Sequence, residues 1–101
     1  MTAYVVAMAE VQEDSALSEA DAYLDWDDAV NAADDFMMRC VGDFYEIDPA
    51  LPEKRRAKVE ERVSRETSVF KGQQKLECSF RDPERMFVVA TSVQETEIKW
   101  S

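Results

Sequence analysis

Residues 25–42, Asp25-WDDAVNAADDFMMRCV-Gly42, carry the pattern that decides the fold of this chain. Apolar side chains recur here at steps of three and four, so they form one stripe along an α-helix. Asp25 suits the N-cap, and Gly42 suits the position just after the last turn. We therefore predict an amphipathic helix between these residues. Its apolar stripe consists of Trp26, Ala29, Val30, Ala33, Phe36, Met37, Cys40 and Val41.

Apolar and alternating runs on both sides of this helix predict the strands of a sheet. Residues 3–9 (AYVVAMA) are continuously apolar, which is typical of a central strand buried on both faces. Residues 75–81 alternate between apolar and polar side chains, as a half-buried strand does. Residues 86–90 (MFVVA) are their natural hairpin partner, across a turn at Asp82-Pro83-Glu84. This last strand can continue through Val93 towards Ile98 and Trp100.

Two further segments complete the predicted order of elements. Residues 18–24 (SEADAYL) alternate like an edge strand, but Ser18 and Asp21 also fit a capping box for an early helix; the strand is favoured. Pro52 suits the first position of a second helix, roughly 52–66, whose surface is mainly basic.

The order β-(β)-α-α-β-β predicts an α+β fold, with an antiparallel sheet of three to five strands packed against two helices. A length of 101 residues suits one compact domain, 1–101. Cys40 and Cys78 are expected as reduced thiols in or near the core, and a disulfide or a reactive thiol is the alternative. The predicted core contains Val5, Val6, Trp26, Val30, Phe36, Met37, Leu76, Phe80, Phe87 and Val89.

Negative charge is concentrated in the first half of the chain. The first 38 residues contain ten Asp and Glu and no Lys or Arg. Through Pro52 the net charge is −12, whereas residues 53–101 carry +2, which together make the −10 of the whole chain. Such a field repels nucleic acid and acidic membranes and attracts basic surfaces. We therefore expect a basic protein partner, with no direct nucleic-acid or membrane binding.

The residues needed for common enzyme chemistry are scarce in this sequence. The chain has no histidine, which removes the most common general base and most zinc sites. Its two glycines lie in no phosphate-binding loop. Asp25-Trp26-Asp27-Asp28 has oxygen ligands for calcium or magnesium, but it lacks the spacing of an EF-hand, and helix capping explains the same residues. We therefore predict a non-enzymatic protein without cofactor or metal.

The polar face of the predicted helix carries the candidate binding residues. Asp27 and Asp28 lie seven positions before Asp34 and Asp35, about 10 Å along one face. Carboxylates at this spacing on a rigid helix can imitate a run of backbone phosphates. A solvated face without a partner is the alternative interpretation. A second acidic patch is expected at Glu10, Glu13 and Asp14, with Tyr23 or Tyr45 as exposed aromatic anchors.

A compact, histidine-free, acidic α+β domain with a base-free block from Glu10 to Asp35 resembles the small inhibitors of phages and mobile elements. Proteins of this anti-CRISPR and anti-restriction type often act as nucleic-acid mimics or steric plugs. The resemblance implies an inhibitor that occupies a basic nucleic-acid-binding site, and it transfers no site residues to this chain.

Two other functions remain open at this level. The chain could be an accessory subunit that packs through the apolar connection 43–51, or an enzyme that works through carboxylates. A homodimer that pairs the basic second helix with the acidic half is a further possibility. No apolar run approaches the roughly 20 residues of a membrane span, and the start MTAYVVAMAE lacks a basic n-region. A cytoplasmic location is therefore expected.

Overall fold

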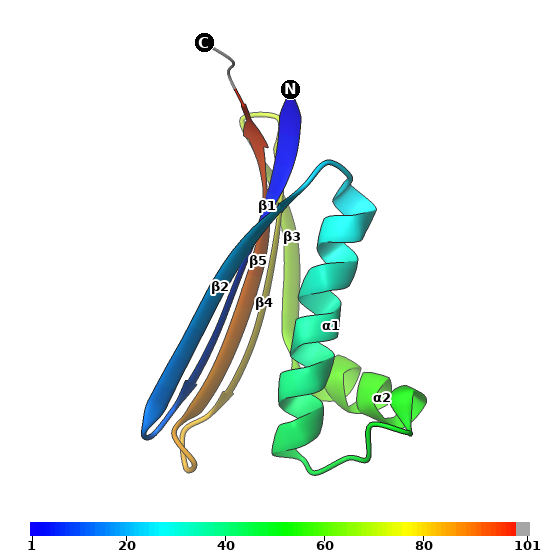
Figure 1. Cartoon of the computed structure of the whole chain (residues 1–101), viewed down its shortest axis with the longest axis vertical. Helices are drawn as coiled ribbons and strands as arrows, with labels where there is room; N and C mark the ends of the chain where they lie inside the picture. The colour runs from blue at the N-terminus through cyan, green and yellow to red at the C-terminus, as the bar shows by residue number, and fades with distance from the viewer. Residues whose placement is uncertain (99–101) are drawn as a thin grey trace.

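One face of an antiparallel five-stranded sheet is covered by the first helix, and the second helix packs against the first on the same side, in the computed structural model, which describes residues 1–98 (Figure 1). The strands lie in the order β2-β1-β5-β4-β3, and Met1 lies beside Ile98 at one end of the sheet. This arrangement confirms the predicted α+β class. The elements are β1 (Thr2–Gln12), β2 (Ser15–Tyr23), α1 (Trp26–Phe44), α2 (Pro52–Arg62), β3 (Ser64–Phe70), β4 (Gln73–Asp82) and β5 (Phe87–Glu97).

The core lies between α1 and the middle of the sheet. Cross-strand partners such as Val6 with Val93 and Val93 with Leu76 point to the same side, where α1 covers them. Below the C-terminal turn of α1, Phe44 stacks on Phe87 at 4.7 Å between ring centroids. Most of the predicted core is confirmed as buried: Val6, Phe36, Met37, Leu76, Phe80, Phe87 and Val89. The other three, Val5, Trp26 and Val30, are half-buried.

Both edges of the sheet are formed by segments whose strand character the sequence did not show clearly. Residues 18–24 do not form a helix; most of them belong to β2, an edge strand, which confirms the favoured interpretation. The second helix begins at Pro52 as predicted, but its predicted end near residue 66 was wrong, because α2 ends at Arg62 and β3 begins at Ser64. β3 escaped prediction because all seven of its residues are exposed, so no apolar alternation marks it. Trp100, where the last strand was expected to end, lies outside the described residues.

The function predicted for Gly42 was also wrong. Asp25 caps α1 as expected, since its Oδ1 accepts a hydrogen bond from the Asp28 amide at 3.2 Å. At the other end, however, α1 continues through Gly42 to Phe44. Glu46, with a φ of 57°, takes the left-handed conformation there, and the Ile47 amide donates to the Gly42 carbonyl at 2.9 Å. This is a Schellman motif in which a non-glycine residue terminates the helix.

Gly42 instead makes room for a buried arginine. Arg55 of α2 lies across the end of α1 and is only 8% exposed. Its guanidinium donates to the carbonyls of Arg39 (3.4 Å) and Ile47 and pairs with the Asp43 carboxylate at 2.9 Å. A Cβ on Gly42 would lie 2.7 Å from Arg55 Nη1. Gly42 is therefore required because α2 approaches α1 closely at this position. Arg55 holds the two helices together through its contacts with the C-terminal end of α1.

The predicted burial of residues 3–9 on both faces is wrong for this single chain. Tyr4, Val6 and Met8 face the helices, but the opposite face of the sheet is not covered by any element of residues 1–98 (Figure 1). On that open face Ala7 is exposed and Val5 and Ala9 are only half-buried. β1 therefore has the sequence of a two-sided core strand and the environment of a one-sided one.

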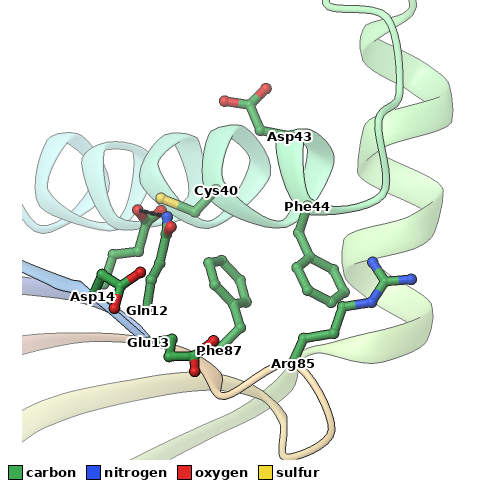
Figure 2. Close-up of a pocket in the computed structure, with 9 residues that line it drawn as sticks. Gln12, Glu13, Asp14, Cys40, Asp43, Phe44, Arg85 and Phe87 are labelled. Atoms are coloured by element: carbon green, nitrogen blue, oxygen red, sulfur yellow. Dashed lines mark hydrogen bonds between the residues drawn. The ribbon is translucent and has the colours of Figure 1, made fainter.

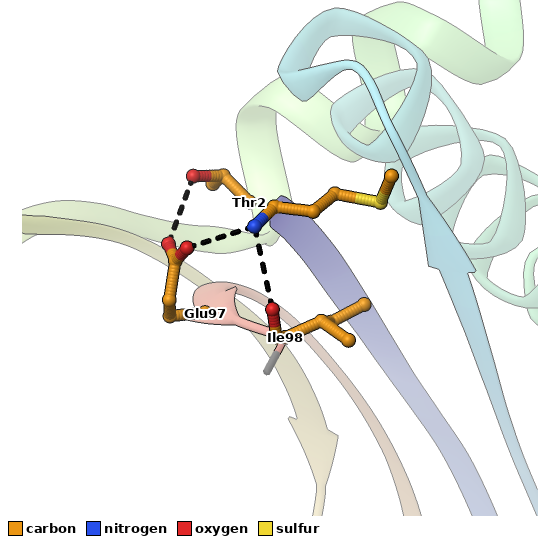
Figure 3. A network of polar contacts seen from close by, with 4 residues as sticks. Thr2, Glu97 and Ile98 are labelled. Carbon is orange, nitrogen blue, oxygen red and sulfur yellow. Dashed lines mark hydrogen bonds and ion pairs between the residues drawn. The ribbon is translucent and has the colours of Figure 1, made fainter. Parts of the chain in front are cut away.

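The two ends of the chain are tied together by polar contacts. The N-terminal ammonium of Met1 lies 2.9 Å from Glu97 Oε1 and 3.3 Å from the Ile98 carbonyl, and Thr2 donates to Glu97 Oε2 at 3.1 Å (Figure 3). These hydrogen bonds lower the pKa of Glu97 below its usual value. These contacts lie at the Thr2–Glu97 pair of the β1–β5 ladder, where β1 begins and β5 ends. None of the helices in residues 1–98 is both long and apolar enough to cross a membrane.

Candidate protein-binding surface

The segregation of charge along the sequence becomes a segregation across the width of the sheet. β1 and β2, which carry only acidic charged residues, form one side of the sheet, whereas β4 and β3 form the other. α2, with five bases and three acids, packs against α1 and precedes β3 on that second side. One side of the sheet is therefore acidic and the other side carries both signs of charge, so the electrostatic potential of the molecule is strongly asymmetric.

The aspartates on the polar face of α1 differ in their partners: those of the first turn have no ion pair among residues 1–98, whereas one in the middle of the helix does. Asp27 and Asp28, in the first turn of α1, are exposed and belong to no ion pair among residues 1–98. Asp34 is half-buried, and its Oδ1 lies 2.6 Å from Arg65 Nη1 of β3. Asp35 lines a groove with Arg56 of α2. The structure thus commits Asp34 to an internal ion pair and places Asp35 beside a base.

The second predicted patch lies at the opposite end of α1, around a hollow of about 510 Å³ (Figure 2). Glu13 and Asp14 form the β1–β2 turn at its rim, and Glu10 reaches in beside Cys40. Gln12 Nε2 donates to Glu10 Oε1 at 2.9 Å. The three acidic residues are therefore brought together as expected, but roughly 18–24 Å of helix separates Cys40 and Asp43, which line the hollow, from Asp27 and Asp28.

Two acidic residues of β2 connect the patches and were not predicted as contacts. Glu19 and Asp21 pair with Met8 and Val6 of β1, so their side chains project on the helix side of the sheet. β2 lies at the edge, and both residues are exposed. The alternation of residues 18–24 contained this information, since it places Glu19 and Asp21 on one face and Ala20 and Ala22 on the other.

Together these residues form a continuous band, which we call the acidic flank. It runs from the N-terminal end of α1, along the edge strand β2, to the β1–β2 turn. None of its carboxylates belongs to an ion pair among the described residues 1–98. Its members are Glu10, Glu13, Asp14, Glu19, Asp21, Asp25, Asp27 and Asp28.

The proposed aromatic anchors are less accessible than expected. Tyr23 and Tyr45 are both half-buried against the core. Within the connection 43–51, Phe44 is half-buried and Ile47 is buried, so these apolar anchors are already packed inside the chain. The most exposed aromatic among residues 1–98 is Phe70, at 70%, the last residue of β3. Its exposure was not foreseen because β3 itself was not predicted.

The side chains around the hollow are poorly suited to nucleophilic catalysis. Burial, reinforced by a hydrogen bond and the charge of Glu10, raises the pKa of the Cys40 thiol to about 12. A thiol with such a pKa stays protonated and unreactive at neutral pH. Both cysteines are free and buried, as predicted from the sequence. Within residues 1–98, no group of three or more His, Cys, Asp or Glu side chains is arranged to hold a metal ion.

The raised pKa of Cys40 predicts how stability responds to alkaline pH. The folded thiol keeps its proton up to about pH 12, whereas the unfolded thiol loses it near pH 9.0. Its contribution is therefore complete below pH 9 and is lost as the pH rises towards 12. Urea titrations across this range should show a shallower loss of stability for Cys40→Ala than for the parent. Equal pH slopes for the two proteins would contradict the assignment.

Comparison of this chain with protein-family models, with curated proteins and with solved structures gives no match.

Proposed function

We propose that this protein is a non-enzymatic inhibitor that binds, through its acidic flank, the basic nucleic-acid-binding site of another protein. The observation that supports this function is that the acidic flank holds eight carboxylates within a stretch of 38 residues that has no Lys or Arg, and that none of the eight has an ion-pair partner among the described residues 1–98. Unpaired carboxylates on one side of a chain of net charge −10 repel one another at a cost to stability. A basic partner removes that repulsion when it binds.

The dimensions of the acidic flank fit those of a nucleic-acid strand. The nine residues of β2 extend for about 30 Å. One strand of B-form DNA carries about nine phosphates over that length. Of the eight carboxylates of the flank, Glu19 and Asp21 lie on β2 itself, three lie at or near the β1–β2 turn, and three lie at the N-terminal end of α1. A comparable number of negative charges therefore spans a comparable length, with most of them near its two ends. A cleft that binds a phosphate backbone through Lys and Arg would meet a comparable row of negative groups.

The test compares two variants with the same change in net charge. Glu13→Gln, Asp14→Asn, Glu19→Gln and Asp21→Asn together neutralise the part of the flank on β2 and its turn. Glu53→Gln, Glu60→Gln, Glu66→Gln and Glu84→Gln neutralise exposed acidic residues elsewhere. Each immobilised protein is incubated with host lysate and eluted with duplex DNA, and the eluted proteins are identified by mass spectrometry. Association with an eluted protein is then timed at physiological salt.

We expect the parent and the second variant to retain a nucleic-acid-binding protein that duplex DNA displaces. The flank variant should associate with it about ten- to a hundredfold more slowly, because steering charges act first on the on-rate. Equal association rates for both variants, or no protein that DNA displaces, would contradict the proposed function. Melting temperatures of both variants serve as the folding control.

A further inference from the structure

The open face of the sheet is uncharged across three adjacent strands. β2, β1 and β5 carry seven acidic residues when their connecting turn is included, yet every one lies on the helix side or in the turn. The open face of these strands has only small or uncharged side chains, although 34% of the chain is charged. They are Ala3, Val5, Ala7, Ala9, Val11, Ala16, Ser18, Ala20, Ala22, Val88, Ala90, Ser92, Gln94 and Thr96.

This distribution is the reverse of the one expected for a face in contact with water. A solvated sheet face normally carries the polar half of the alternation. Here the acidic residues of the edge strand β2 are on its other side, while Val11 and Val88 of the open face remain 45% and 37% exposed. A bare apolar face of this size indicates an interaction surface.

We propose that the open face is the interface of a symmetric homodimer, in which two sheets pack face to face. The uncharged face of β2, β1 and β5, at a strand spacing of about 4.8 Å and about ten residues of 3.3 Å per strand, presents roughly 480 Å² per copy. The open face of β4, which carries Lys75, Glu77, Ser79 and Arg81, adds about 160 Å². Only with β4 included does the total of about 1,300 Å² lie within the range of stable protein interfaces, about 1,200–2,000 Å². The small side chains of β2, β1 and β5 allow close approach, and the longer side chains of β4 lie at the margin of the contact.

The distribution of charge limits the surfaces through which a second copy of the chain can pack, and the open face of β2, β1 and β5 is the uncharged one. With a net charge of −10, two copies repel each other through most surfaces, but the open faces of β1, β2 and β5 contain nothing that repels. An aligned packing with the two-fold axis parallel to the strands, between β1 and β5, places β2 of one copy over β4 of the other. β4 brings Lys75, Glu77 and Arg81 to this face, and Lys75 is paired with Glu77 at 2.9 Å. Arg81 is then the base that approaches β2, whose carboxylates project on the helix side of the sheet.

The test is the molecular mass in solution. At a protein concentration of about 100 μM the parent should sediment at twice its monomer mass of 11.6 kDa, because interfaces of this size bind at micromolar Kd or tighter. Ala7→Glu places a buried charge at the centre of the interface and should produce a monomer. Ala20→Glu, on the edge strand, tests the same face with less risk to folding. Ala57→Glu on the exposed side of α2 adds the same charge and should remain dimeric.

A monomeric parent at about 100 μM, or a folded Ala7→Glu or Ala20→Glu variant that remains dimeric, would overturn the proposal. Far-ultraviolet circular dichroism and the melting temperature show whether each variant is folded. A monomeric parent would leave the open face to a different protein. The result is independent of the proposed inhibitory function, since none of these substitutions changes the acidic flank.

Discussion

Replacement of Phe36 by Ala is expected to lower the free energy of unfolding by about 3–5 kcal/mol. The Phe36 ring is 4% exposed and lies in the main core cluster beneath α1. Arg39 covers it, with its guanidinium carbon 5.3 Å from the ring centroid. Truncation would leave a cavity that the rigid helix and sheet cannot close. For a marginally stable domain of this size, such a loss is a large part of the total stability.

Urea denaturation of the parent and the variant measures this effect. Phe36→Leu retains most of the volume and should cost less than about 1.5 kcal/mol. Asn31→Ala, on the exposed side of the same helix, should change stability by no more than about 0.5 kcal/mol. A denaturation midpoint for Phe36→Ala that equals that of the parent would show that the ring is not part of the core and that α1 has a different rotation.

The second large effect is the coupling between Gly42 and Arg55. In the parent, Gly42→Ala should destabilise the protein by about 1–3 kcal/mol, because the new Cβ overlaps three atoms of the Arg55 side chain, each within 2.9 Å. Arg55→Ala should cost about 2–3 kcal/mol through the lost hydrogen bonds to the Arg39 and Ile47 carbonyls.

The combined variant should reverse the sign of the glycine substitution. Once Arg55 is truncated, the three atoms nearest to the new methyl group are gone. Gly42→Ala should then stabilise the helix by up to about 1 kcal/mol, which is the usual difference in helix propensity. A double-mutant cycle in urea measures the coupling, expected at about 2–4 kcal/mol. If Gly42→Ala has the same effect with and without Arg55, the contact between the two helices is not the reason for the glycine.

The acidic flank could be predicted only in part. Asp27, Asp28, Glu10, Glu13 and Asp14 are exposed or half-exposed without ion pairs, in agreement with their local patterns. Asp34 follows the same helical pattern but is paired with Arg65, 31 positions away. Helical periodicity shows which side of a helix a residue occupies, but it does not show which strand will lie there.

The sequence by itself determined the α+β class, the cap of α1, the hairpin of β4 and β5, and the concentration of acidic charge in the first half. These features depend on periodicity and composition within short windows, which local physics controls. Only the tertiary structure decided that β3 exists as an exposed edge, that Gly42 accommodates Arg55, and that β1 has an uncovered face. Each of these depends on contacts between residues that are distant in the chain, and their geometry is set by packing rather than by any local pattern.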